Sequence, residues 1–295
     1  MIKNYILHLR PKSFIPSFTF TLTGYAINPH KGATGSVAVE LLSLFFIYSV
    51  LLFGGTCALN THFDKDTGPL NFLENPPEKP KYLGHFGIIL MFLAVVLSSH
   101  FGPWAMAMSA FSLVLSVLYS VKLPGFARRG KEIGIVDNLI NALGCGFVGV
   151  IMGATFSDSL PDLSTILLAI SFTITVAGSY PATQIFQLKA SDSYAVGRNF
   201  TTLLGPTRAL RVGAALLIAG LVIADLTQIL FFPKQAGFSS MILFFGFNMF
   251  FLLGVVQMYK WSRTPFDNNK SRYGALIKTL LGARLLWIAA EWIIS

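Results

Sequence analysis

Residues 60–80 read "NTHFDKDTGPLNFLENPPEKP", a polar and acidic stretch between two long apolar runs. The neighbouring runs, 37–59 and 83–99, are each long enough for a helix to cross the ~30 Å hydrocarbon core of a bilayer, which takes at least ~17 residues. The stretch therefore predicts a loop at the membrane surface that joins two transmembrane helices. Its first acidic residues, Asp64 and Asp66, come shortly after the apolar run 37–59.

Composition indicates an all-α, polytopic membrane protein. Of the 295 residues, 54% are hydrophobic and only 12% are charged, whereas a soluble domain carries about a quarter charged residues. The net charge of +9 does not indicate a nucleic-acid partner, because no stretch reads as a nucleic-acid-binding module and the basic residues lie at the ends of apolar runs. No repeat or linker divides the sequence, so we expect one transmembrane domain over residues 1–295.

Nine apolar segments are candidates for transmembrane helices. The first is short and contains Pro16, so a count of seven or eight is also compatible with the sequence. The segments lie at 13–28, 37–59, 83–99, 103–120, 135–156, 163–187, 209–232, 237–259 and 274–294.

The basic residues lie almost entirely on one side of these segments. Eighteen of the 22 Lys and Arg residues fall in the N-terminus and the loops on its side, against only Lys31 and Lys234 in the opposite loops. By the positive-inside rule, the N-terminus is cytoplasmic and the C-terminus lies outside. In a prokaryote this membrane would be the plasma membrane. Most acidic loop residues share the cytoplasmic side, so we expect the active site there.

Glu40 and Asp225 are two of the acidic residues that fall within the apolar segments. Glu40 is near the outer end of its segment, where we expect water to reach it. Asp225 is near the middle of its segment, and both a structural hydrogen bond and a protonated carboxyl remain open for it.

The acidic stretch carries the pattern of a metal site. If the second helix continues through residue 64, Asn60 and Asp64 lie one turn apart on one face, Asp66 lies in the last turn or just beyond, and 68–69 (Gly-Pro) ends the helix. A helix C-terminus has partial negative charge and unpaired carbonyls, so carboxylates there favour a bound cation. Oxygen ligands of this kind suit Mg²⁺. The alternative is a solvated loop at the membrane surface.

These features resemble the UbiA superfamily of intramembrane prenyltransferases, whose first aspartate-rich motif reads N-D-x-x-D-x-x-x-D after the second of nine helices. Asn60 and Asp64 match that motif, while Thr61 and Gly68 stand at its other two acidic positions. The resemblance implies that Asp66 replaces the last aspartate. It also implies a helical bundle around a central cavity that opens to the cytoplasmic side.

Further motifs carry the resemblance along nearly the whole chain. "LRPKSF" resembles the L-R-P start of the family and contains Arg10. "LYSVKLPGF", with Tyr119 and Lys122, resembles its Y-S/T…K segment. "IVDNLINALGCG" resembles its D-x-x-x-N-x-x-G stretch through Asp137 and Asn141.

The second aspartate-rich motif of the family is the main departure, so the chain is a divergent member by this resemblance. Gln184 and Gln187 lie where aspartates are expected after the sixth helix, and Asp192 is the remaining carboxylate of that region. A glutamine oxygen can ligate Mg²⁺ but brings no charge. Both glutamines are equally open to hydrogen bonding between helices.

The resemblance implies Mg²⁺-dependent transfer of an isoprenoid from a prenyl diphosphate to a lipophilic acceptor in the bilayer, an aromatic acceptor being one option. The alternatives are a terpene cyclase on the same scaffold and a non-catalytic protein that binds or transports a lipid or pigment precursor. The sequence identifies neither the acceptor nor the donor length, and it does not predict the oligomeric state.

The resemblance also assigns residues to roles. For the basic residues, a topology signal is the alternative to a role in binding. The metal ligands would be Asn60, Asp64, Asp66 and Asp192. The diphosphate site would draw on Arg10, Asn60, Lys122, Arg128, Arg129, Lys131, Asp137, Asn141, Gln184, Gln187, Lys189 and Arg198. The catalytic set would be Asp64, Asp66, Tyr119 and Lys122.

Overall fold

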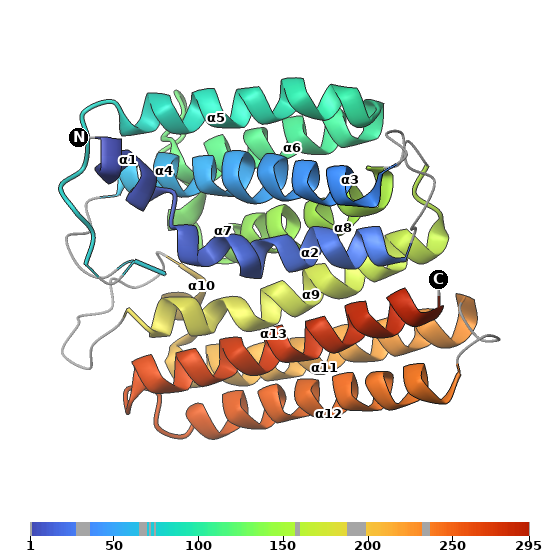
Figure 1. Cartoon of the computed structure of the whole chain (residues 1–295). Helices are drawn as coiled ribbons and strands as arrows, with labels where there is room; N and C mark the ends of the chain where they lie inside the picture. The colour runs from blue at the N-terminus through green and yellow to red at the C-terminus, as the bar shows by residue number, and fades with distance from the viewer. Residues whose placement is uncertain are drawn as a thin grey trace. The chain divides into compact units, whose positions relative to one another are not determined.

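The computed structural model describes residues 2–27, 36–64, 70, 72–73, 75–156, 160–187, 199–231 and 237–294. Within these residues the chain is helical, apart from turns and one isolated bridge between Leu70 and Leu73. The predicted all-α class is confirmed (Figure 1).

Eight helices are long and apolar enough to cross a membrane. They confirm eight of the nine predicted segments in the part of the chain that the structure describes. They are Val37–Phe63, Leu83–Phe101, Pro103–Ser120, Gly134–Thr155, Leu163–Ile185, Pro206–Phe231, Phe238–Trp261 and Asn269–Ile293.

The first predicted segment, 13–28, is a shorter helix than expected. It appears as α2 (Phe14–Ala26), whose 13 residues span only ~20 Å at 1.5 Å per residue. It cannot extend backwards into α1 (Ile2–His8), because Arg10 has a left-handed backbone conformation with φ 57° that no helix continues through. The count of full-length spans is therefore eight among the described residues.

The chain divides into two compact units. The N-terminal unit comprises Met1–Gly130 and Val148–Pro161, and the C-terminal unit comprises Lys131–Phe147 and Asp162–Ser295. The N-terminal unit holds α1, α2, the long helix formed by α3 (Val37–Leu44), a π-helical segment (Phe45–Phe53) and α4 (Gly54–Phe63), then α5 (Leu83–Ser98), α6 (Pro103–Ser120) and α8 (Val148–Thr155). The C-terminal unit holds α7 (Gly134–Ala142), α9 (Leu163–Ile185), α10 (Phe200–Leu204), α11 (Pro206–Phe231), α12 (Phe238–Trp261) and α13 (Asn269–Ile294).

Glycines let the helices of the N-terminal unit approach to backbone contact. A Cβ on Gly24 of α2 would overlap the carbonyl oxygen of Val150, and one on Gly153 of α8 would overlap that of Thr21. Small residues at such crossings are typical of helices in lipid, where packing rather than hydrophobicity drives association. The short helix α2 is therefore fixed along its length against the transmembrane helix that contains α8.

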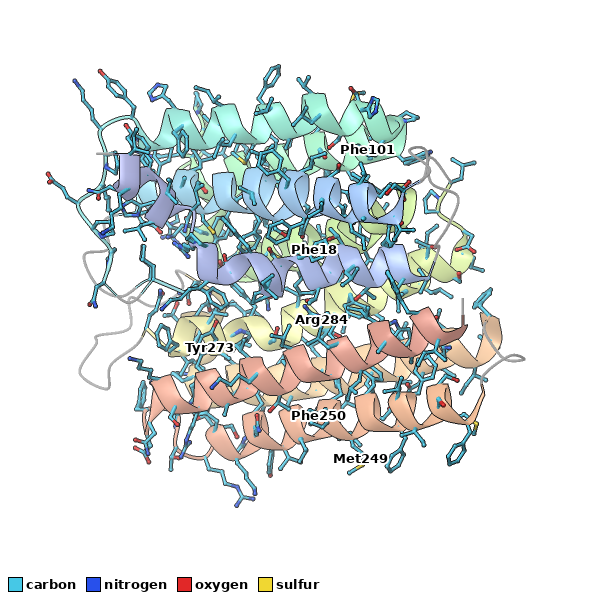
Figure 2. The ribbon with its side chains drawn as sticks, viewed as in Figure 1. Phe18, Phe101, Met249, Phe250, Tyr273 and Arg284 are labelled. Atoms are coloured by element: carbon cyan, nitrogen blue, oxygen red, sulfur yellow. The ribbon has the colours of Figure 1, made fainter. Side chains whose placement is uncertain are left out.

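The same device recurs at other helix pairs. Gly55 of α4 faces Gly87 of α5, where a Cβ on Gly55 would lie 2.8 Å from the carbonyl oxygen of Gly87. In the C-terminal unit, Gly178 of α9 faces Gly213 of α11, and a Cβ on Gly178 would lie 2.7 Å from the Gly213 oxygen. Aromatic rings also pack between helices. Phe18 of α2, labelled in Figure 2, meets Phe45 edge-on, with the two ring centroids 5.3 Å apart.

We predict that Gly153→Ala destabilises the protein, because its methyl would force α2 and α8 apart. Overpacking of this kind costs about 1–3 kcal/mol. Gly274→Ala is the matched control, since a Cβ at that helical position meets nothing within 4 Å. Thermal unfolding in detergent should give a midpoint several degrees lower for the first variant only. Equal midpoints would contradict the close crossing.

Candidate functional site

The first predicted motif lies at the end of α4. The helix ends at Phe63, and Asp64 is its C-cap residue with an extended backbone (φ −76°, ψ 137°), while its N–H still donates to the carbonyl of Asn60 at 3.0 Å. Asn60 and Asp64 are thus one turn apart, as predicted, but the helix stops before the Gly-Pro pair at 68–69 that was expected to end it. Asp66 falls outside the described residues.

Two basic side chains from other segments cap this helix end. Arg129 Nη1 lies 3.2 Å from Asp64 Oδ1 and donates to the carbonyl of Phe63 at 3.0 Å. Lys79 Nζ donates to the carbonyl of Asp64. Both cations meet the carbonyls that a helix end leaves unpaired and the negative end of the helix dipole. The Asp64 side chain is only 5% exposed, and that of Arg129 is 16% exposed.

Arg10, in the connection between α1 and α2, reaches the same turn of α4. Its Nη2 donates to Thr61 Oγ1 at 3.1 Å, the residue is 9% exposed, and its Nε has no hydrogen-bond partner among the described residues. A left-handed backbone at a non-glycine residue costs on the order of 1–3 kcal/mol and is frequent at functional sites. The strained turn thus aims a buried guanidinium at the motif.

Helix α1 holds the segment that carries Lys79. Asn4 Nδ2 donates to the carbonyl of Glu78 at 3.3 Å, and the buried His8 lies close to Lys79 and Arg10. Burial lowers the pKa of His8, and the two neighbouring cations lower it further. A neutral His8 adds no charge to this region, so α1 positions Lys79 without altering the charge around Asp64.

The residues at this helix end fit a Mg²⁺ ion. Asn60 Oδ1 is buried and has no hydrogen-bond donor among the described residues, which costs about 1–3 kcal/mol unless a ligand satisfies it. An amide oxygen and a carboxylate one turn apart are two ligands of the kind that Mg²⁺ takes, with water completing the shell. No group of three or more His, Cys, Asp or Glu residues that could hold a metal ion occurs in the described part of the chain, and Asp66 and Asp192 lie outside it.

A second polar cluster forms in the C-terminal unit around Pro181 of α9, where one backbone hydrogen bond of the helix is missing. Pro181 lies inside this helix and has no N–H, so the carbonyl of Ala177 lacks its usual helical partner. Asn138 Nδ2 of α7 donates to that carbonyl at 3.0 Å. The proline therefore explains why the polar face of α7 packs against α9 at this depth.

Asp137, next to Asn138, is the centre of this second cluster. It is 1% exposed, and its carboxylate accepts hydrogen bonds from Tyr180 Oη at 3.0 Å, from Gln184 Nε2 and from the Phe200 N–H at 3.5 Å. Gln184 Oε1 in turn accepts the Thr201 N–H at 3.1 Å. Gln184 thus links α7 to the first turn of α10, so both ends of its amide are engaged within the protein.

The other predicted residues are less closely grouped. Asn141 lies one turn from Asp137 and donates to the Asp137 carbonyl at 2.9 Å. Tyr119 is half-buried in the last turn of α6, and Lys122 is exposed just beyond that helix. The remaining candidates divide into exposed Arg128 and Gln187, half-buried Lys131 in a 3₁₀ turn, and Asp66, Lys189, Asp192 and Arg198 outside the described residues.

Sequence reasoning missed Lys79, Thr61 and Tyr180. Tyr180 could have been found, because it lies four residues before Gln184 and so shares its face of α9. Lys79 carries no such signal, and neither does the pairing of Arg129 with Asp64, although the resemblance had placed Arg129 in the diphosphate site. Their contacts with Asp64 join segments 15 and 65 residues apart, and only the folded chain brings these together.

Glu40 and Asp225, two carboxyls within the membrane segments, each have a hydrogen-bond partner. Glu40 is 1% exposed and accepts a hydrogen bond from Tyr25 Oη at 2.7 Å, so the expectation that water reaches it is wrong. Asp225 Oδ1 accepts from Asn248 Nδ2 at 3.2 Å, which confirms the structural hydrogen bond that was one option for it.

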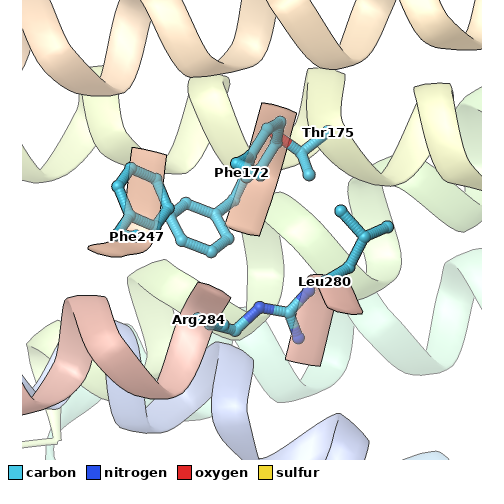
Figure 3. Close-up of a pocket in the computed structure, with 6 residues that line it drawn as sticks. Phe172, Thr175, Phe247, Leu280 and Arg284 are labelled. Carbon is cyan, nitrogen blue, oxygen red and sulfur yellow. The ribbon is translucent and has the colours of Figure 1, made fainter. Parts of the chain in front are cut away.

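Arg284 lies deep within α13 beside a small pocket in the C-terminal unit. Its guanidinium carbon is 5.7 Å from the ring centroid of Phe172, and Phe247 and Thr175 also line the pocket (Figure 3). The cavity measures ≈ 10 Å³, which is about the room one water needs. The cavity is therefore too small for an isoprenoid, and the feature of this place is the cation–π contact between Arg284 and Phe172.

This architecture is similar to that of known proteins. A model of the UbiA prenyltransferase family matches residues 17–277. Curated protein sequences gave no match. A solved structure of a digeranylgeranylglyceryl phosphate synthase has a TM-score of 0.68 at 17% identity, covering 99% of both chains.

Structures of a UbiA homologue from Archaeoglobus fulgidus are also similar. The one bound to GPP and Mg²⁺ has a TM-score of 0.61 at 14% identity, covering 99% of both chains. The one bound to Cd²⁺ has a TM-score of 0.63 at 14% identity, covering 99% of this chain and 98% of the other. The TM-scores show a shared fold, and the family model, which matches residues 17–277, shows that the chain belongs to the family. The chain is therefore a multi-pass membrane protein of the UbiA prenyltransferase family.

Proposed function

We propose that the chain transfers an isoprenoid from a prenyl diphosphate to a lipophilic acceptor, with Mg²⁺ as cofactor. The observation that carries this proposal is the orphaned Asn60 oxygen one turn from the Asp64 carboxylate, at a helix end surrounded by cations. Family membership supports prenyl transfer in general. The similar fold of a homologue solved with GPP and Mg²⁺ is consistent with this donor and this metal.

The residues at the end of α4 have the properties that ionisation of a prenyl diphosphate needs. The C–O bond breaks with its electron pair going to the diphosphate, which leaves an allylic cation on the prenyl carbon. When bound by Asn60 and Asp64, Mg²⁺ would supply Lewis acidity toward the leaving group. Arg10, Lys79 and Arg129 add positive charge near the same turn, which stabilises the charge that develops.

The acceptor completes the reaction by attacking the allylic cation and losing a proton. We assign Tyr119 to cation stabilisation through its ring face, a contribution of about 0.5–2 kcal/mol, and Lys122 to the diphosphate. Asp66 and Asp192 as metal ligands, and Arg128, Lys131, Gln187, Lys189 and Arg198 as diphosphate ligands, complete the proposed assignment. We place these residues on the cytoplasmic side of a single domain, with the N-terminus inside and the C-terminus outside.

A non-catalytic protein that binds a prenyl diphosphate is the second candidate. The observation that favours it is the engagement of Gln184, whose amide is held by Asp137 and Thr201 and brings no charge where the family has aspartate. Such a protein would bind the donor without releasing diphosphate. A terpene cyclase would release diphosphate with no acceptor present.

We predict that Asp64→Asn lowers Mg²⁺-dependent diphosphate release from geranylgeranyl diphosphate by about 100-fold or more, because the site then loses the negative charge that holds the metal beside the leaving group. Asp267→Asn is the matched control, since Asp267 is an exposed carboxylate outside both clusters. Purified protein in lipid would be assayed with and without a membrane-lipid extract, and with EDTA. Absence of release by the unaltered protein with donors of every length would favour the binding protein.

We predict that Gln184→Asp destabilises the C-terminal unit, because two carboxylates would then share one buried site in place of a hydrogen-bonded pair. A lost bond to a buried charged group costs about 1–3 kcal/mol. The double variant Asp137→Asn, Gln184→Asp restores one amide and one carboxylate with their positions exchanged. Its thermal midpoint should recover much of the loss. A double variant less stable than either single variant would show that the Asp137–Gln184 pair is not the relevant contact.

A further inference from the structure

Arg129 pairs with Asp64, the carboxylate that the proposed function assigns to a metal ion. Its Nη1 is 3.2 Å from Asp64 Oδ1 and 3.0 Å from the Phe63 carbonyl oxygen, so it meets both the carboxylate and the end of the helix dipole. The contact is largely shielded, since the two side chains are 16% and 5% exposed. Charges interact more strongly at such a site than in open water.

A free divalent cation would meet unfavourable conditions at this site. To bind Asp64 it must compete with a guanidinium already paired to the same oxygen, and the two positive charges would repel each other. A metal that took Asp64 would displace Arg129 from Asp64 and from the Phe63 carbonyl, without bringing an anionic oxygen for the guanidinium in exchange. Free Mg²⁺ should therefore bind weakly despite the orphaned Asn60 oxygen.

A Mg²⁺–diphosphate complex meets no such obstacle. Its metal can replace Arg129 at Asp64, and its phosphate oxygens can take the guanidinium in return, in the planar two-point geometry that arginine and phosphate share. The exchange starts with two ion pairs, Arg129 with Asp64 and Mg²⁺ with diphosphate. It ends with every charge still neighbouring an opposite one.

We propose that the site recognises the metal–diphosphate complex as a unit and that Arg129 makes it do so by exchanging Asp64 for the diphosphate. This inference rests on the proposed function, of which it defines the substrate species. Arg129 is a positioning residue in the ligand-free chain, where it holds Asp64 at the end of α4.

The other two cations of the site do not have this exchange role. Arg10 Nη2 donates to the neutral hydroxyl of Thr61, and Lys79 donates to the backbone carbonyl of Asp64. Neither bond must break when a metal takes the carboxylate. The structure thus distinguishes one exchanging cation, Arg129, from two fixed ones.

The test compares metal binding and pyrophosphate binding in full-length protein in lipid nanodiscs. Mn²⁺ alone is titrated by electron paramagnetic resonance, and labelled pyrophosphate by equilibrium dialysis in saturating Mg²⁺ or in EDTA. Arg129→Gln should bind Mn²⁺ alone roughly 5-fold or more tightly, and pyrophosphate in Mg²⁺ roughly 5-fold or more weakly. These shifts have opposite signs, whereas a merely structural role would weaken both.

Arg263→Gln is the matched control, because it removes the same charge from an exposed arginine whose guanidinium lies over the Tyr259 ring at 5.3 Å. It should move neither affinity. Equal effects of the two variants would mean a general loss of positive charge and would overturn the exchange. So would unchanged or weaker Mn²⁺ binding by Arg129→Gln.

Asp64→Asn gives a second test that does not depend on the Arg129 variant folding. It removes the carboxylate that holds Arg129, so pyrophosphate in EDTA should bind more tightly than to the unaltered protein, while Mn²⁺ binding is lost. Weaker pyrophosphate binding in EDTA would overturn the proposal. Diphosphate release by the unaltered protein is measured separately, so failure of the enzyme proposal is distinguishable from failure of the exchange.

Discussion

A carbonyl that a helix leaves unpaired is the constraint on which both polar clusters depend. Where protein or lipid excludes water from such a group, the protein must supply a donor. At the end of α4 the donors are Arg129 for Phe63 and Lys79 for Asp64. At Pro181 of α9 the donor is Asn138, which donates to the Ala177 carbonyl because Pro181 has no N–H. Each repair brings a charged or polar side chain to a fixed position.

The two repairs have different electrostatic results. At α4 the donors are cations, so the helix end is positive despite Asp64 and suits a ligand that carries both a metal and several anionic oxygens. At α9 the donor is a neutral amide, and its neighbour Asp137 is satisfied by Tyr180, Gln184 and backbone N–H groups. The first cluster thus has an unsatisfied Asn60 oxygen for a ligand, while the Asp137 carboxylate has its donors within the protein.

The sequence was informative where local periodicity decides the structure. Apolar length predicted eight of the described spans, because a helix in lipid must match the bilayer thickness, and i to i+4 spacing placed Asn60 and Asp64 together. For α2 it predicted a short helix at 13–28, which the structure shows over Phe14–Ala26, and this short length is tolerated because Gly24 and Gly153 fix α2 against α8. It could not rank the basic residues. Arg128 and Arg129 are adjacent in sequence, yet Arg129 pairs with Asp64 and Arg128 is exposed.

The departure at Gln184 has a physical reason that motif comparison alone does not provide. An aspartate at this position would place a second carboxylate beside Asp137 in a site with 1% exposure, and like charges there would need a proton or a cation to coexist. Glutamine instead donates to Asp137 and accepts from Thr201, so one side chain satisfies a buried carboxylate and a helix N–H together. The residue type at position 184 therefore depends on the carboxylate at position 137. The acidic side chain of this pair is on α7 and its neutral partner is on α9.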